Sequence, residues 1–174
     1  MPIFEINNRK PVIDPSSWIA PTAQIIGDVT IGKRCYIGFG AILRGDYGAI
    51  IIGDESAIEE GVVIHSNPDD KTVLGKRVTV GHMAMIHNST IHDNAVIGIQ
   101  ATICDFSEIG PWAIIAEQSL VIKKQKVPGH KIFTGAPATE KRDLSEELKT
   151  VWNAGKESYV DLTRQYGDSL KRLD

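Results

Sequence analysis

An aliphatic residue recurs at every sixth position through most of this 174-residue chain. An amphipathic helix repeats near 3.6 residues and a half-buried strand alternates every two, so neither produces this period. A six-residue period is typical of parallel β-helix solenoids, in which we take three hexapeptides to form one triangular coil. The aliphatic positions are Ile25, Ile31, Ile37, Leu43, Ile52, Ile58, Ile64, Leu74, Val80, Ile86, Ile91, Ile97, Ile103, Ile109, Ile115 and Val121.

Three breaks interrupt the period. Compared with the six-residue period, the spacing from Leu43 to Ile52 is three residues longer and that from Ile64 to Leu74 is four residues longer. The spacing from Ile86 to Ile91 is one residue shorter. Insertions in a solenoid leave at corners and often form binding surfaces. The first two breaks carry the segments Arg44-Gly45-Asp46-Tyr47-Gly48 and Ser66-Asn67-Pro68-Asp69-Asp70.

The phase of the repeat predicts a column of polar side chains. The aliphatic positions Leu43, Ile64 and Ile86 should stack on one face of successive coils. Arg44, His65 and His87 each follow one of them directly, so they should stack as well. Neighbouring strands lie about 4.8 Å apart, which lets His65 and His87 share one metal ion.

His82 has a different phase from this pair. It lies two residues after Val80, on the preceding face of the coil, and the chain turns a corner between His82 and His87. A neighbouring prism related by threefold symmetry can supply His82 instead. We therefore expect a homotrimer with the metal between subunits.

Three neutral imidazoles with an open fourth position form a catalytic zinc-type site. Such a site makes hydroxide available near neutral pH, because the metal lowers the pKa of its bound water. We predict one divalent metal per subunit, zinc first, with iron or cobalt as alternatives that suit the same ligands. The competing interpretation is three unrelated histidines on turns.

Composition limits the possible partners and the compartment. A net charge of −3 gives no electrostatic basis for binding nucleic acid or an anionic membrane. No apolar run approaches the roughly 20 residues that span a bilayer, and the first residues lack a secretory signal pattern. Cys35 and Cys104 lack metal-binding spacing, so we expect reduced packing thiols in a cytoplasmic protein.

The pattern predicts one domain over residues 1–174, with the β-helix at about 12–137 and a C-terminal helix at about 143–172. Asp143-Leu144-Ser145-Glu146 fits a capping box at the start of that helix. We expect the helix to pack along the prism through an apolar stripe. The stripe comprises Leu144, Leu148, Val151, Trp152, Tyr159, Leu162, Tyr166 and Leu170.

The segments RGDYGAIIIGDESAIEEGVVIH and VTVGHMAMIHNSTI, with the closing GAPA and helix, resemble the gamma-class carbonic anhydrase family over nearly the whole chain. The resemblance implies an all-β solenoid, a left-handed parallel β-helix, assembled as a trimer. It implies that His65 and His87 bind the metal from one subunit and His82 from its neighbour.

The same resemblance assigns roles to three further residues. Arg44 and Asp46 would form an ion pair at the subunit interface, close to bicarbonate; a plain corner salt bridge is the alternative. Tyr159 is similar to a helix tyrosine that borders the site in this family.

Two departures from the family pattern concern the chemistry. Glu59 stands where the family usually has a glutamine that hydrogen-bonds the metal-bound water, and Ala57 stands at a nearby asparagine position. An ionised carboxylate accepts hydrogen bonds and cannot donate one. The acidic proton-shuttle loop of the most active members is also missing, with Tyr47 and Pro68 at the matching places.

The leading functional hypothesis is a lyase that interconverts carbon dioxide and bicarbonate, with Arg44, Asp46, Glu59 and Tyr159 around the metal. Two alternatives act on coenzyme A esters: a hexapeptide acyltransferase, which typically uses one histidine base, or a metal-dependent thioesterase. A third alternative is a non-catalytic metal-binding scaffold.

Overall fold

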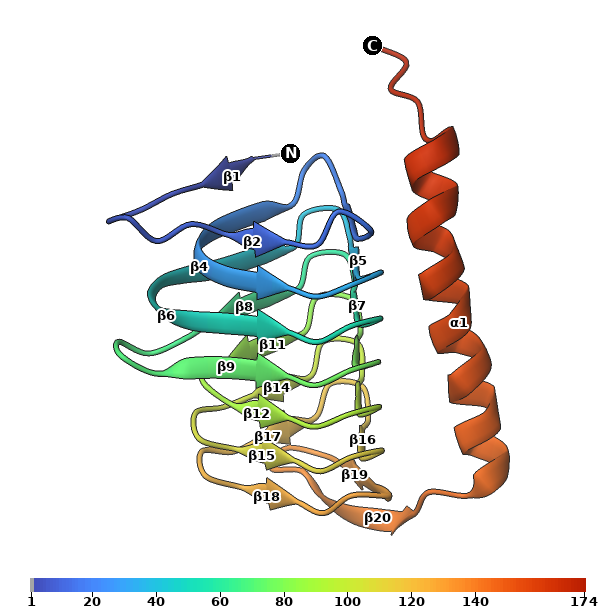
Figure 1. Cartoon of the computed structure of the whole chain (residues 1–174). Helices are drawn as coiled ribbons and strands as arrows, with labels where there is room; N and C mark the ends of the chain where they lie inside the picture. Colours follow the sequence, from blue (N-terminus) through green and yellow to red (C-terminus); the bar gives the residue numbers. More distant parts are fainter. Residues whose placement is uncertain (1) are drawn as a thin grey trace.

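The computed structural model describes residues 2–174, which form a left-handed parallel β-helix of about 7 turns with one α-helix beside it (Figure 1). The predicted fold class is confirmed. No helix within these residues is long and apolar enough to cross a membrane.

Two faces of the prism form one 12-stranded sheet, because β4 (Gln24–Ile31) and β6 (Ile42–Ile52) each continue around a corner. The other strands of the first face are β1 (Ile3–Phe4), β8 (Val63–His65), β11 (Met85–His87), β14 (Thr102–Ile103) and β17 (Leu120–Val121). Those of the second face are β2 (Val12–Ile13), β9 (Lys71–Leu74), β12 (Thr90–Ile91), β15 (Glu108–Ile109) and β18 (Lys126–Val127).

The third face is a separate 8-stranded sheet. Its parallel strands are β3 (Trp18–Ile19), β5 (Tyr36–Ile37), β7 (Ala57–Ile58), β10 (Thr79–Val80), β13 (Val96–Ile97), β16 (Ile114–Ile115) and β19 (Lys131–Thr134). β20 (Thr139–Asp143) pairs antiparallel to β19 and closes this sheet at its end.

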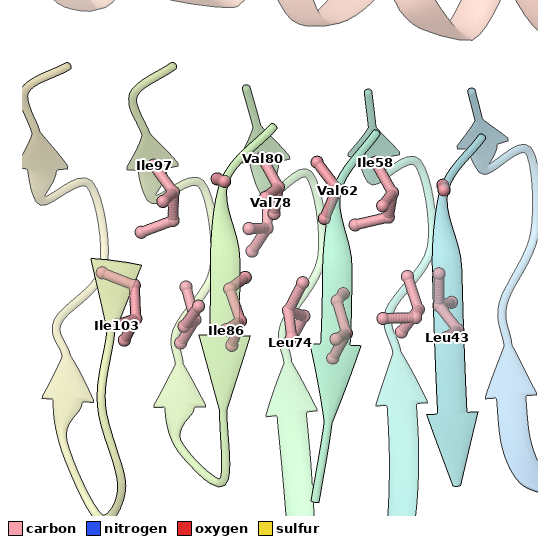
Figure 2. Packing of buried hydrophobic residues seen from close by; sticks show 14 of the residues in the cluster. Leu43, Ile58, Val62, Leu74, Val78, Val80, Ile86, Ile97 and Ile103 are labelled. Carbon is pink, nitrogen blue, oxygen red and sulfur yellow. The ribbon is translucent and has the colours of Figure 1, made fainter. Parts of the chain in front are cut away.

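Inward-pointing aliphatic side chains from all three faces fill the prism (Figure 2). Equivalent positions pair across neighbouring coils: Leu43 with Ile64, and Ile64 with Ile86. These side chains are fully buried. Truncating one of them to alanine would cost about 2–5 kcal/mol, because its neighbours above and below are part of the same close-packed stack. The six-residue period thus fixes the register of the coils.

α1 (Glu146–Ser169) starts at the far end of the solenoid and runs back along the third face (Figure 1). Ser145 caps it by accepting a hydrogen bond from the Leu148 N–H at 3.2 Å. Tyr159 and Tyr166 of the predicted stripe pack against the sheet, but Val151 of the same stripe does not. Val151 is 61% exposed, whereas Lys156 and Thr163 are buried.

Aromatic side chains attach the second half of α1 to the first coils. Tyr166 packs edge-on against Trp18, with ring centroids 4.7 Å apart, and Tyr159 lies 5.2 Å from the ring of Tyr36. Since aromatic pairs bury large areas in defined orientations, this cluster fixes where α1 lies over the third face.

Lys156 is the polar anchor of α1. Its Nζ donates to the carbonyl oxygen of Arg77 at 2.8 Å, to Oγ1 of Thr79 at 3.1 Å and to the carbonyl oxygen of Ala95 at 3.4 Å. Burial, together with the nearby Arg77 charge, lowers the pKa of Lys156 to about 7. The lysine therefore loses its proton far more readily in the folded chain than in the unfolded one.

We expect the free energy of unfolding to rise as the pH rises from about 7 towards 9. In this range the unfolded chain keeps a proton on Lys156, whose ordinary pKa is 10.5, while the folded chain releases it. Lys156 should therefore add about 2 kcal/mol to the free energy of unfolding between about pH 7 and pH 9. Lys156→Met should remove this part of the slope, as measured by urea unfolding at several pH values. If the free energy of unfolding rose equally with pH in the wild type and in the variant, Lys156 would not be the group responsible.

Candidate metal centre

Strand register places the predicted column together. Arg44 pairs with His65 across β6 and β8, and His65 pairs with His87 across β8 and β11. All three point outward from the first face, directly after the buried aliphatic positions. The phase prediction for this column is therefore correct.

The two imidazoles of the column face each other. Nδ1 of His65 lies 3.0 Å from Nε2 of His87. The other nitrogen of each ring meets a carboxylate: Nε2 of His65 lies 3.1 Å from Asp46, and Nδ1 of His87 lies 2.9 Å from Asp105. Burial lowers the pKa of His65 from its ordinary 6.5, against the opposing contact with Asp46. A neutral ring, the form that can bind a metal, is thereby favoured.

Arg44 and Asp46 form an ion pair within one chain. Nη1 of Arg44 donates to Oδ2 of Asp46 at 2.6 Å, while Oδ1 of the same carboxylate faces His65. Burial opposes ionisation of Asp46, but the hydrogen bonds from Arg44 and His65 prevail and lower its pKa. Gly45 permits this arrangement, because a Cβ there would collide with the carbonyl group of Asp28 on the previous coil. The side chain of Arg44 is 42% exposed and remains free to meet an anion.

Asp105 is a site residue that the sequence analysis missed. It follows β14 in the next coil, where Ile103 pairs with Ile86. Its Oδ1 lies 2.9 Å from Nδ1 of His87 and accepts a hydrogen bond from the Asn67 side chain at 2.8 Å. Burial opposes the ionisation of Asp105, yet these two hydrogen bonds lower its pKa. Its position two residues after a column-face isoleucine was the available signal.

His82 lies at the corner after β10, outside the His65–His87 pair. Its Nε2 lies 3.0 Å from Glu59 and its Nδ1 lies 2.8 Å from Glu60. Across residues 2–174, no three His, Cys, Asp or Glu side chains converge as a metal-binding group. One chain therefore brings two of the three predicted ligands together and holds the third on another face.

Glu59 and Tyr159 lie beside His82. Glu59 is 6% exposed and accepts a hydrogen bond from the backbone N–H of His82 at 3.2 Å, and Tyr159 lines the same groove between α1 and the third face. Burial raises the pKa of Glu59, and the hydrogen bond from Tyr159 opposes that shift. The structure thus groups these two predicted residues with His82 and away from the Arg44 column.

The donor set of the column is suited to a divalent metal. Two imidazole nitrogens only 3.0 Å apart can reach one ion, since zinc–imidazole bonds are about 2.0–2.1 Å long. A carboxylate on the far side of each ring is the usual arrangement around metal-binding histidines, because it fixes the ring and raises its basicity. A third imidazole has to come from outside this pair. To serve as that ligand, His82 must release one of its carboxylate contacts to free a lone pair.

Known proteins are similar to this chain in sequence and in fold. The Hexapep family, described as bacterial transferase hexapeptide (six repeats), matches residues 10–45 of this chain. Gamma carbonic anhydrase 2, mitochondrial, of Arabidopsis thaliana is 33% identical over 93% of this chain, which spans 60% of that protein. Carnitine operon protein CaiE of Escherichia coli K12 is 33% identical over 98% of this chain and 87% of its own length. A putative acetyltransferase structure from Bacillus cereus is 34% identical, with a TM-score of 0.93 over 94% of this chain and 95% of that one.

The chain belongs to the gamma carbonic anhydrase and hexapeptide-repeat family. The predicted resemblance is confirmed at this level. Two of these relatives, the gamma carbonic anhydrase and the putative acetyltransferase, carry the names of enzymes.

Proposed function

We propose that this protein interconverts carbon dioxide and bicarbonate at a metal site shared between subunits of a homotrimer. The observation that supports the proposal most is the in-register pair of His65 and His87, each ring backed by a carboxylate, with Arg44 next in the column. Two imidazoles that face each other on the outer surface of the prism contribute nothing to the packing of its core.

In this proposal His65 and His87 hold the metal together with the partner subunit's His82. A divalent metal supplies a water activated for attack on carbon near neutral pH. Zinc is our first choice, with iron or cobalt as alternatives. Arg44 binds the bicarbonate anion through its exposed guanidinium, and Asp46 holds that guanidinium in place at 2.6 Å.

Acyl transfer is the second candidate, because the Bacillus cereus structure is titled a putative acetyltransferase. An acyltransferase needs a histidine free to accept a proton from its substrate. In this chain one ring nitrogen of His65 faces one of His87, and the other nitrogen of each ring faces a carboxylate. This arrangement leaves no free base for a substrate and favours the metal hypothesis.

The direct test is elemental analysis of anaerobically purified protein, paired with stopped-flow hydration of carbon dioxide. We expect about one metal per subunit and measurable hydration. Metal-free protein that transfers acetyl from acetyl-coenzyme A would support the second candidate and contradict the first.

A mixing experiment tests whether the site is shared. His82→Ala and His87→Ala each remove one ligand, so each pure trimer should lose metal and activity. Mixed trimers should regain both, because an interface between a His82→Ala subunit and a His87→Ala subunit can still assemble all three imidazoles.

The matched control is a mixture of His65→Ala with His87→Ala. These two ligands lie in one chain 3.0 Å apart, so no interface of that mixture holds an intact set. Metal analysis and hydration assays on co-expressed, separately tagged chains measure the outcome. Equal recovery in both mixtures, or a monomer in light scattering, would contradict a shared site.

Asp105→Ala should weaken metal binding about 10- to 100-fold, because His87 would lose the carboxylate that fixes its ring. Asp105→Asn should retain more affinity, since its amide oxygen can still accept from Nδ1. Competition with a chelator measures both variants. Wild-type affinity in Asp105→Ala would exclude a positioning role.

Glu59→Gln should raise the hydration rate about tenfold at constant metal content. Two negative charges about 5 Å apart repel by on the order of 3 kcal/mol at an effective dielectric of about 20, so an ionised Glu59 opposes a bicarbonate nearby. The substitution also loosens the carboxylate contact that holds His82. A slower variant that keeps its metal would instead make Glu59 a working base.

A further inference from the structure

A groove of about 330 Å³ lies between α1 and the third face. Its floor is formed by outward side chains of three successive strands, Thr79 of β10, Val96 of β13 and Ile114 of β16. Trp152 and Tyr159 of α1 cover it. Figure 1 shows α1 running along this face of the prism.

The residues that line the groove indicate the charge of the ligand that it can bind. They are mainly aliphatic and aromatic, and the carboxylates of Glu59 and Glu117 lie among them. No lysine or arginine belongs to the part of the described chain that lines it. The buried ammonium of Lys156 is turned to three sheet oxygens. The two carboxylates disfavour an anion, and the mainly apolar lining makes any charged group costly to bury, so we take the ligand to be uncharged and partly apolar.

The size of the groove exceeds what carbon dioxide needs. Small-ligand pockets begin at about 300 Å³, whereas a single water occupies about 30 Å³ in the liquid. Three strands at about 4.8 Å spacing give a floor about 10 Å long, which is long enough to hold a butyryl or hexanoyl chain.

His82 and Glu59 line the groove as well, so it reaches the residue that our proposed function assigns to the metal. We infer that the groove binds the short acyl chain of an uncharged ester, and that the protein hydrolyses that ester at the same centre. This inference rests on the proposed function for the activated water. Arg44 belongs to the column on the first face, so the acid product would meet a cation outside the groove.

The reaction is balanced by water alone. The water oxygen bonds to the acyl carbon, and the bond from that carbon to the leaving oxygen breaks. The electron pair of the broken bond stays with the leaving group, which takes a proton from the water. The products are a carboxylic acid and an alcohol.

Binding is tested without metal or turnover. Hexan-2-one, an uncharged ketone that cannot be hydrolysed, is titrated into full-length metal-free protein while the methyl resonances of Val96 and Ile114 are followed by NMR. We expect saturable shifts at both residues. Ile114→Phe should abolish binding by filling the groove, and Val96→Met gives a second, milder filling variant.

Ile132→Phe is the matched control, because Ile132 pairs with Ile114 in the next coil yet does not line the groove. It should bind the ketone like the wild type. Absence of ketone shifts in folded wild-type protein, as would follow if a neighbouring subunit fills the groove, overturns the inference.

Turnover is tested with 4-nitrophenyl butyrate beside carbon dioxide hydration and metal analysis. Ile114→Phe should lower kcat/KM for the ester at least tenfold while hydration changes less than twofold. An unchanged ester rate, or an equal loss in both assays, overturns the inference. Ketone binding in a protein that neither retains metal nor hydrates carbon dioxide would instead defeat the proposed function and leave the groove as a binding site.

Discussion

The stacking of inward aliphatic side chains in register is the interaction on which the rest of this molecule depends. Each coil buries its own side chains only against the coils above and below, so a one-residue slip would turn the apolar set outward. The same register brings His65 opposite His87 and Arg44 opposite His65. The polar column is thus aligned by the packing of Leu43, Ile64 and Ile86 behind it.

Around that column, carboxylates decide what the imidazoles can do. Asp46 and Asp105 occupy the outer nitrogens of His65 and His87, which leaves the inner nitrogens facing each other. Glu59 and Glu60 instead occupy both nitrogens of His82. The first pair is prepared for a shared ligand, whereas His82 has to exchange a carboxylate for one. Glu59 contacts His82 and also lines the groove beneath α1, so it links the proposed metal site to that groove.

α1 covers the third face and forms a groove with it. Lys156 and the aromatic pairs at Tyr159 and Tyr166 hold the helix onto the sheet at separate points. Trp152 and Tyr159 cover the groove between helix and sheet. Because His82 is among the residues that line the groove, the helix borders an apolar approach to the proposed centre, and Arg44 offers a cation on another face.

The sequence by itself determined the solenoid, its three faces and the column of Arg44, His65 and His87, because a six-residue period and the spacing of its breaks fix register without any long-range information. It also placed the start of the C-terminal helix near Ser145. Only the tertiary structure decided that Asp105 backs His87, that Glu59 and Tyr159 meet at His82, and that Lys156 rather than Val151 faces the sheet. Those contacts join different coils or join the helix to the prism, so they depend on side-chain direction and helix rotation, which a periodic pattern does not encode.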